Sequence, residues 1–234
     1  MEENYQIKIQ DVSIAHDDNL VLSNIYLNIK ESEFVYIIGR VGSGKSSLLK
    51  ALYADISLVS GNIDILDFKL ESIKNSQIPV LRRQIGMVFQ DFQLLSDRSV
   101  KDNLKFVLKA TAWKDSEKIN NRITEVLEQV DMLAHINKMP FELSGGEQQT
   151  IAIARAILNN PPIIFADEPT GNLDPESAET ILTILKDLNE SGKTIVMVTH
   201  NYTLLKKYPA RTVLCENKTL RDLPQHEAFD LSDF

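Results

Sequence analysis

The sequence predicts an α/β protein with a mainly parallel core sheet, an N-terminal antiparallel β subdomain and an inserted helical subdomain. Three observations predict this class. Residues 1–30 alternate apolar and polar side chains, residues 34–38 are a continuous apolar run before a glycine-rich loop, and residues 91–142 have apolar side chains at helical spacing. Beyond residue 142 strands alternate with helices, which favours parallel strands joined by right-handed crossovers.

The individual elements follow from the same patterns in chain order. The N-terminal alternation predicts antiparallel strands on either side of a polar turn at 16–19. The apolar run Phe34–Ile38 predicts a strand buried on both faces, followed by a helix from Lys45 to about Asp55. The later elements are expected as a strand at 85–89, helices within 91–142, a helix at 147–158, a strand at 163–166, a helix around 181–188 and a strand at 194–198.

These elements predict one domain over residues 1–221, with the helical subdomain inserted at about 91–160. The remaining residues, 222–234, include four acidic side chains and no lysine or arginine. We expect them to form a flexible acidic tail, because chain ends without an apolar pattern are rarely held by packing.

Composition and charge limit the class of function. The 234-residue chain is 43% hydrophobic and 25% charged, with a formal net charge of −8. Such an acidic protein lacks the basic face that nucleic acid requires, so no nucleic-acid partner is expected. No apolar run approaches the roughly 20 residues that span a bilayer, and the N-terminus lacks signal-peptide features. We expect a cytoplasmic protein that reaches a membrane through a partner, with Cys215 as a buried, inert thiol.

The strongest motif is the glycine-rich loop that follows the predicted buried strand. Its residues are Gly39, Arg40, Val41, Gly42, Ser43, Gly44, Lys45 and Ser46, and Ser47 extends it. The glycines allow backbone N–H groups to close on a phosphate, Lys45 can reach the β- and γ-phosphates, and the Ser46 hydroxyl can ligate Mg²⁺. We predict an ATP and Mg²⁺ site here. A structural glycine turn is the competing interpretation, and the strand–loop–helix context disfavours it.

Polar side chains follow three further predicted strands. Asp167 and Glu168 end the strand at 163–166, at the edge where open α/β sheets bind ligands. We predict Asp167 as a Mg²⁺ ligand and Glu168 as the group that polarises the attacking water. Gln90 can touch both Mg²⁺ and this water, and His200 can contact the γ-phosphate. Taken singly, each could instead be a solvated strand end or a structural side chain.

A second anion site is predicted at the start of the helix near residue 147. The heptapeptide Leu143–Gln149 reads LSGGEQQ, and its Ser144 hydroxyl and the N–H groups of Gly145 and Gly146 fall at a helix N-terminus, with Glu147 beside them. One nucleotide and two phosphate sites indicate that two copies of the protein share each ATP.

In their order, these motifs resemble those of the ABC-type ATPases over nearly the whole chain. The resemblance identifies Walker A at 39–46, the glutamine of the Q-loop at Gln90, the signature at 143–149, the end of Walker B at 167–168, the D-loop at 172–174 and the switch histidine at His200. It implies the P-loop ABC cassette fold and adds Asp174 to the nucleotide site. It also implies a head-to-tail homodimer, in which the signature of one subunit closes over the γ-phosphate bound by the other.

Two positions depart from the pattern of this family. His16 occupies the position of the aromatic residue that stacks on adenine, and Thr150 stands where an arginine usually follows the signature. Imidazole can stack on a base, so we include His16 among the predicted nucleotide-binding residues. The departure at Thr150 puts one charge contact of the signature helix in doubt.

The segment 89–103 is closely similar to the cell-division ATPases of this family, most specifically in Asp97-Arg98-Ser99 and Asp102-Asn103. This resemblance implies an integral membrane partner, a position on the cytoplasmic side of the inner membrane, and a role in cell-wall remodelling without transport. The alternatives are the ATPase of a lipoprotein-releasing or macrolide-exporting transporter, a soluble ABC protein acting on DNA or ribosomes, and an ATP-binding regulator that does not hydrolyse ATP.

Overall fold

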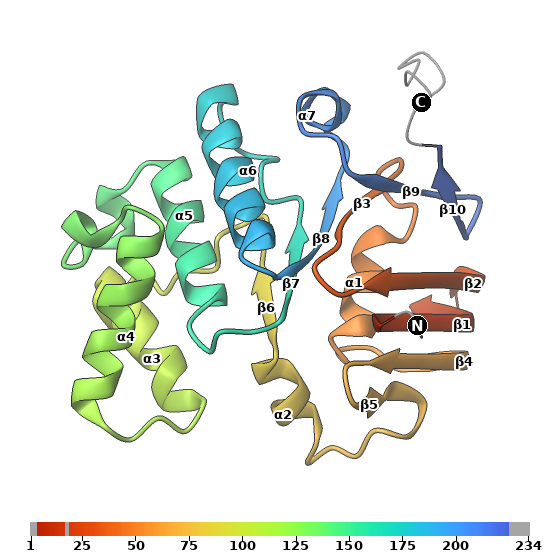
Figure 1. Cartoon of the computed structure of the whole chain (residues 1–234), viewed down its shortest axis with the longest axis horizontal. Helices are drawn as coiled ribbons and strands as arrows, with labels where there is room; N and C mark the ends of the chain where they lie inside the picture. The colour runs from red at the N-terminus through yellow and green to blue at the C-terminus, as the bar shows by residue number, and fades with distance from the viewer. Residues whose placement is uncertain (1–3, 17–18, 225–234) are drawn as a thin grey trace.

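The core of the molecule is a six-stranded sheet with the strand order β10-β9-β3-β8-β7-β6 (Figure 1). The computed structural model describes residues 4–16 and 19–224. The strands of this sheet are β3 (Phe34–Ile38), β6 (Ile85–Val88), β7 (Ile163–Asp167), β8 (Thr194–Thr199), β9 (Arg211–Glu216) and β10 (Thr219–Leu223). Every neighbouring pair is parallel except the β9–β10 hairpin. The predicted mainly parallel core sheet is confirmed.

A second sheet of four antiparallel strands contains the N-terminal residues and has the order β2-β1-β4-β5. Its strands are β1 (Tyr5–His16), β2 (Asn19–Lys30), β4 (Leu58–Ile65) and β5 (Phe68–Lys69). The buried side chains of β2 are Leu22, Ile25, Leu27 and Ile29, while the side chains between the last three are exposed. The N-terminal antiparallel subdomain is therefore confirmed.

The helices fall into two groups. Four accompany the core sheet: α1 (Lys45–Leu52), α2 (Ile78–Arg83), α6 (Pro175–Glu190) and α7 (Tyr202–Lys207). Three lie together beside it in Figure 1: α3 (Val100–Ala110), α4 (Ser116–Gln129) and α5 (Gly145–Ala156), with short 3₁₀ turns at Leu133–His135 and Pro140–Glu142, and a further turn at Leu70–Ser72 after β5. In the described part of the chain, no helix has the length and apolar character needed to cross a membrane.

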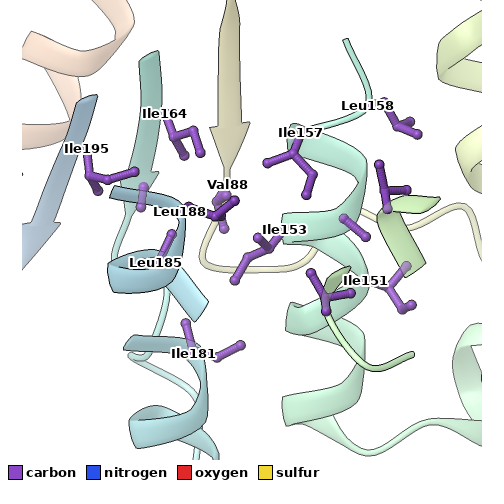
Figure 2. Close-up of a cluster of buried hydrophobic side chains, with 14 of the residues drawn as sticks. Val88, Ile151, Ile153, Ile157, Leu158, Ile164, Ile181, Leu185, Leu188 and Ile195 are labelled. Carbon is purple, nitrogen blue, oxygen red and sulfur yellow. The ribbon is translucent and has the colours of Figure 1, made fainter. Parts of the chain in front are cut away.

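The hydrophobic core lies on both faces of the six-stranded sheet. Strand β3 shows why, because it is buried at every position and its side chains alternate between two clusters. Phe34, Tyr36 and Ile38 belong to the cluster with the helical subdomain, whereas Val35 and Ile37 pack with α1 and the N-terminal sheet. Figure 2 shows side chains of α5 and α6 packed against those of β6, β7 and β8.

The most informative differences from the sequence-based boundaries are at α1, α5 and β10. Helix α1 ends at Leu52, before Ala54 adopts a left-handed φ of 53°. Helix α5 begins two residues earlier than expected, because Ser144 caps it. Asp222, expected to begin the tail, lies in β10, where its carboxylate accepts hydrogen bonds from Arg211 at 2.7 and 3.0 Å. Residues 225–234 of the predicted tail lie outside the described residues.

The packing of α6 on the core sheet generates a stability prediction. Leu185 is fully buried among the side chains of Figure 2. We expect Leu185→Ala to lower the free energy of unfolding by about 2–5 kcal/mol, because it removes buried apolar contacts and leaves a cavity. Urea denaturation with an unchanged m-value measures this. Thr183→Ala, at an exposed position of the same helix, should change stability by about 0.5 kcal/mol or less; equal losses in both variants would contradict the packing described.

Candidate active site

The glycine-rich loop connects β3 to α1 and has a backbone shape that favours glycine. Gly39, Gly42 and Gly44 have φ angles of 149°, 80° and 107°. At Gly39 a side chain is also excluded by space, because a Cβ would lie 2.3 Å from the carbonyl oxygen of Cys215. The other predicted residues at its rim are the exposed Arg40, Val41 and Ser46 and the half-buried Ser47.

Two side chains of this loop present polar groups that an anion would satisfy. Lys45 is buried, and its Nζ donates to the carbonyl oxygens of Gly39 (2.8 Å) and Arg40 (2.9 Å). The buried Ser43 hydroxyl has no hydrogen-bond partner within the described residues. The backbone carbonyl oxygen of Ser43 accepts a hydrogen bond from the thiol of Cys215 (3.2 Å). Burial raises the pKa of this thiol. The predicted burial of Cys215 is confirmed, and the loop fits a nucleotide phosphate.

Ser46 and Asp167 form the part of the site that fits a divalent cation. The Ser46 hydroxyl donates to Oδ1 of Asp167 at 3.0 Å, which brings the start of α1 to the end of β7. Burial is the main cause that raises the pKa of the Asp167 carboxyl, and the hydrogen bond from Ser46 opposes it. One carboxylate and one hydroxyl suit Mg²⁺, which usually takes few protein ligands and completes its shell with water and phosphate oxygens.

Glu168 and His200 are in direct contact beside Asp167. Nδ1 of His200 lies 2.8 Å from Oε1 of Glu168, and the backbone N–H of His200 donates to Oε2 (3.2 Å). The Glu168 side chain is 12% exposed, and its backbone has a left-handed φ of 48°. Its N–H donates to the carbonyl oxygen of Val198 in β8 (3.0 Å). Both carboxylate oxygens are thereby held in place, as a group that must orient a water molecule requires.

Gln90 faces the same edge from the end of β6. A Cβ built on Gly171 would lie 3.2 Å from Nε2 of Gln90, so the amide lies against the loop that follows Glu168. Gln90 and Asp167 also line one cavity of about 540 Å³ together with Lys50. The structure thus brings Ser46, Gln90, Asp167, Glu168 and His200 to one edge of the core sheet.

The signature residues begin α5 with a reciprocal cap. The Ser144 hydroxyl accepts a hydrogen bond from the N–H of Glu147 (3.2 Å), and Oε2 of Glu147 accepts one from the N–H of Ser144 (2.6 Å). The latter bond is the main cause that lowers the pKa of Glu147. Oε1 of Glu147 lies 3.1 Å from Nε2 of His135. Both oxygens of Glu147 therefore have partners within the chain, and its contact with a nucleotide stays a prediction.

The remaining predicted residues lie around this helix or outside the described side chains. Asp174 caps α6 by accepting hydrogen bonds from the N–H (3.0 Å) and hydroxyl (2.6 Å) of Ser177. Ser177 in turn crowds Gly146, where a Cβ would lie 2.5 Å from its Oγ. Thr150 is buried, and its hydroxyl donates to the carbonyl oxygen of Gly146 (2.9 Å). His16 ends β1, and its side chain lies outside the described part of the structure.

The signature and the glycine-rich loop of one chain are far apart in the fold. Figure 1 shows α5 and α1 separated by α6 and the strands of the core sheet. Gly145 of the signature instead lies close to Phe92 and Leu173 of its own chain, at 3.7 and 3.5 Å from a Cβ built on it. The structure brings together the loop, Asp167, Glu168, Gln90 and His200, and it leaves the signature on a separate surface.

Sequence reasoning missed two residues of α5 that contact the active-site segments. Gln149 donates to backbone carbonyl oxygens next to Gln90 and Glu168, and Arg155 donates to those of Phe92 and Gln93. A glutamine and an arginine within an apolar helix are a signal of buried polar contacts, but the sequence does not identify their partners.

Comparison with known proteins gives a consistent result. The family described as ABC transporter matches residues 22–171. The cell division ATP-binding protein FtsE of Mycobacterium tuberculosis is 42% identical over 202 residues, 86% of this chain and 87% of that protein. FtsE of Streptococcus pneumoniae D39 is 38% identical over 218 residues, 92% and 94% of the two chains. The dimeric ATP-binding cassette MJ0796, bound to ADP and Pi, is 34% identical with a TM-score of 0.82, over 94% of this chain and 98% of that chain.

The raised pKa of Asp167 generates a pH-dependent prediction. Folding that raises the pKa of an acid makes the folded state bind the proton more tightly, so the ionised carboxylate destabilises the protein above the folded pKa. Below the ordinary pKa of an aspartate, about 3.9, this penalty is absent. We expect Asp167→Asn to raise the melting temperature at pH 7.5 in Mg²⁺-free buffer, with the gain shrinking as the pH falls toward that value. Asp187→Asn, at an exposed position, is the control; a variant no more stable than wild type at pH 7.5 would contradict the prediction.

Proposed function

The chain belongs to the ABC transporter family of ATPases, and on that premise we propose that it drives a membrane complex of cell division by closing as a homodimer on ATP. It is an ATP-binding and ATP-hydrolysing subunit. The observation that carries the catalytic assignment is the Glu168 carboxylate, which His200 holds at 2.8 Å beside Asp167 at the edge of the core sheet.

The geometry suggests a role for each residue of the site. Lys45 exchanges its contacts with the carbonyl oxygens of Gly39 and Arg40 for the β- and γ-phosphates of ATP. Ser46, Asp167 and Gln90 would hold Mg²⁺, which supplies positive charge to the phosphates when bound. Glu168 orients the attacking water and accepts its proton, and His200 keeps the carboxylate in position and contacts the γ-phosphate.

The second subunit would complete this site with Ser144, Gly145 and Gly146. Within one chain these residues lie apart from the glycine-rich loop, although the N-terminus of a capped helix favours an anion. The related cassette MJ0796 is a dimer bound to ADP and Pi. Both observations support a head-to-tail dimer with two composite sites, in which Glu147 and Asp174 lie close to the nucleotide.

The cell-division role is supported by the FtsE relatives and by the loop before α3. Asn103, in the first turn of α3, is buried, and its amide donates to the carbonyl oxygens of Leu95, Arg98 and Ser99 at 3.0–3.1 Å. The loop that carries Asp97 and Arg98 therefore has a defined shape. We propose an integral membrane partner of the FtsX type on the inner membrane, with a lipoprotein-releasing or macrolide-exporting transporter as the alternative assembly.

A surface of α3 suits such a partner. Phe106 is 52% exposed, and the guanidinium of Arg98 lies 5.3 Å from the centre of its ring. Lys101, Lys105 and Lys109 follow one another at four-residue spacing along the same helix. An exposed aromatic side chain with basic neighbours fits an interface with a membrane protein or its lipid headgroups.

Loss of the catalytic carboxylate tests the proposed reaction. We expect Glu168→Gln to lower ATP turnover about 10²- to 10⁴-fold, because the amide cannot accept the proton from water. The variant should elute as a dimer from gel filtration with ATP and Mg²⁺, and as a monomer with ADP. Glu190→Gln, at the exposed end of α6, should behave as wild type. If the wild-type protein hydrolysed ATP no faster than Glu168→Gln, the protein would bind ATP without hydrolysing it, and the proposed reaction would be wrong.

Charge reversal on α3 tests the partner surface. Changing Lys101, Lys105 and Lys109 to Glu should abolish co-purification with the membrane partner, since it replaces attraction by repulsion, while the ATP turnover of the soluble protein stays within about twofold. The matched control makes the same change at exposed lysines outside the helical subdomain, namely Lys69, Lys74 and Lys218. Unchanged co-purification of the α3 variant would exclude this surface.

A further inference from the structure

We propose that Gln149 and Arg155 of α5 are positioning residues, which tie the signature helix to the segments that carry Gln90 and Glu168 in the same subunit. The inference rests on the proposed composite site and deepens it. In this proposal α5 connects two ATP sites. One is the site of the partner, which the signature of this subunit completes, and the other is the site where this subunit binds its own ATP.

Gln149 contacts both catalytic segments with one amide group. Its side chain is fully buried, and Nε2 donates to the carbonyl oxygens of Phe89 (3.1 Å) and Pro169 (2.7 Å). Phe89 immediately precedes Gln90, and Pro169 immediately follows Glu168. The Oε1 atom is buried without a hydrogen-bond partner among the described residues. A buried amide left half satisfied costs free energy that an apolar side chain would not, so packing alone does not explain it.

Arg155 holds the other side of Gln90, about one and two-thirds turns beyond Gln149 along α5. Its guanidinium donates to the carbonyl oxygen of Phe92 (2.8 Å) and to that of Gln93. The two acceptor residues, Phe92 and Gln93, have left-handed φ angles of 57° and 50°, which residues other than glycine rarely adopt. Burial lowers the pKa of Arg155, so its charge is also held at a cost. The two hydrogen bonds fix a backbone shape that the local sequence does not favour.

The two residues make α5 a rigid connection between sites. Gln90 lies between the contact at Phe89 and those at Phe92 and Gln93. Glu168 is held on one side by the hydrogen bond of its N–H to Val198, and on the other by the bond between Gln149 and Pro169. The helix has 12 residues, about 18 Å in length, and starts at the signature. A shift of α5 when its N-terminus meets the partner's ATP would therefore displace Gln90 and Glu168 of its own site.

Arg122 offers a matched comparison for Arg155. It also donates from one guanidinium to two successive carbonyl oxygens at the end of α5, those of Ile157 (2.7 Å) and Leu158 (2.9 Å). It does so from α4 and, among the described residues, makes no hydrogen bond or ion pair with the segment 89–93. Loss of either arginine should weaken the packing of α5, but only Arg155 connects it to the active site.

The test compares steady-state ATP hydrolysis by Arg155→Met, Gln149→Met and Arg122→Met at a temperature at least 15 °C below each melting point. We expect kcat to fall tenfold or more in Arg155→Met and Gln149→Met with KM for ATP within about threefold, because the glycine-rich loop is unchanged. Arg122→Met should lose a similar amount of thermal stability and keep kcat within about twofold. Arg155→Lys, which retains the charge and one donor nitrogen, should keep part of the wild-type rate, and it remains measurable even if Arg155→Met is too unstable to assay.

Two results would overturn the inference. One is a kcat of Arg155→Met and Gln149→Met equal to that of Arg122→Met; the other is a rise in KM that accounts for the whole loss. If Glu168→Gln still forms ATP-dependent dimers in either case, the proposed function stands and the positioning role alone fails. Absence of ATP-dependent dimers in Glu168→Gln would remove the composite site and the inference with it.

Discussion

Four parallel strands that end at one edge of the core sheet set the constraint on which the site depends. β3, β8, β7 and β6 run side by side in the same direction, so the residues that follow them must meet. The hydrogen bond from Ser46 to Asp167 is the clearest consequence, since it joins residues 121 positions apart in the chain. A parallel sheet supplies this convergence through its backbone, and the side chains need only occupy the strand ends.

The sequence predicts that Gln90, Asp167, Glu168 and His200 share this edge, because each lies at or just after the end of an apolar strand. Their roles in the reaction stay predictions. It predicts the outer elements less well. β4 is half exposed along its length and contains Gly61, so it has neither a buried run nor a clean alternation, and it exists because β1 pairs with it. β10 depends similarly on a contact that appears only in the fold, that of Asp222 with Arg211. The partners of Gln149 were beyond prediction for the same reason, since they are backbone atoms of two other segments.

The active-site region retains several arrangements that stability alone would not favour. Asp167 is a carboxyl whose ionised form is penalised by burial, Glu168 and Phe92 have left-handed backbones, and Arg155 carries a charge in a half-buried position. The apolar clusters on both faces of the sheet offset these costs. Regions of strain and of dense apolar packing thus adjoin each other, which is how a rigid scaffold holds a site in a reactive geometry.

Cys215 beneath the glycine-rich loop has a practical consequence. It is the single cysteine of the sequence, its thiol donates to Ser43, and its carbonyl oxygen blocks any side chain at Gly39. A thiol reagent can reach it only when the loop and β9 separate. The rate at which the Cys215 thiol is alkylated therefore reports how often the phosphate-binding loop opens. A ligand that closes this loop will slow the alkylation of this one sulfur atom, and no label needs to be introduced into the protein.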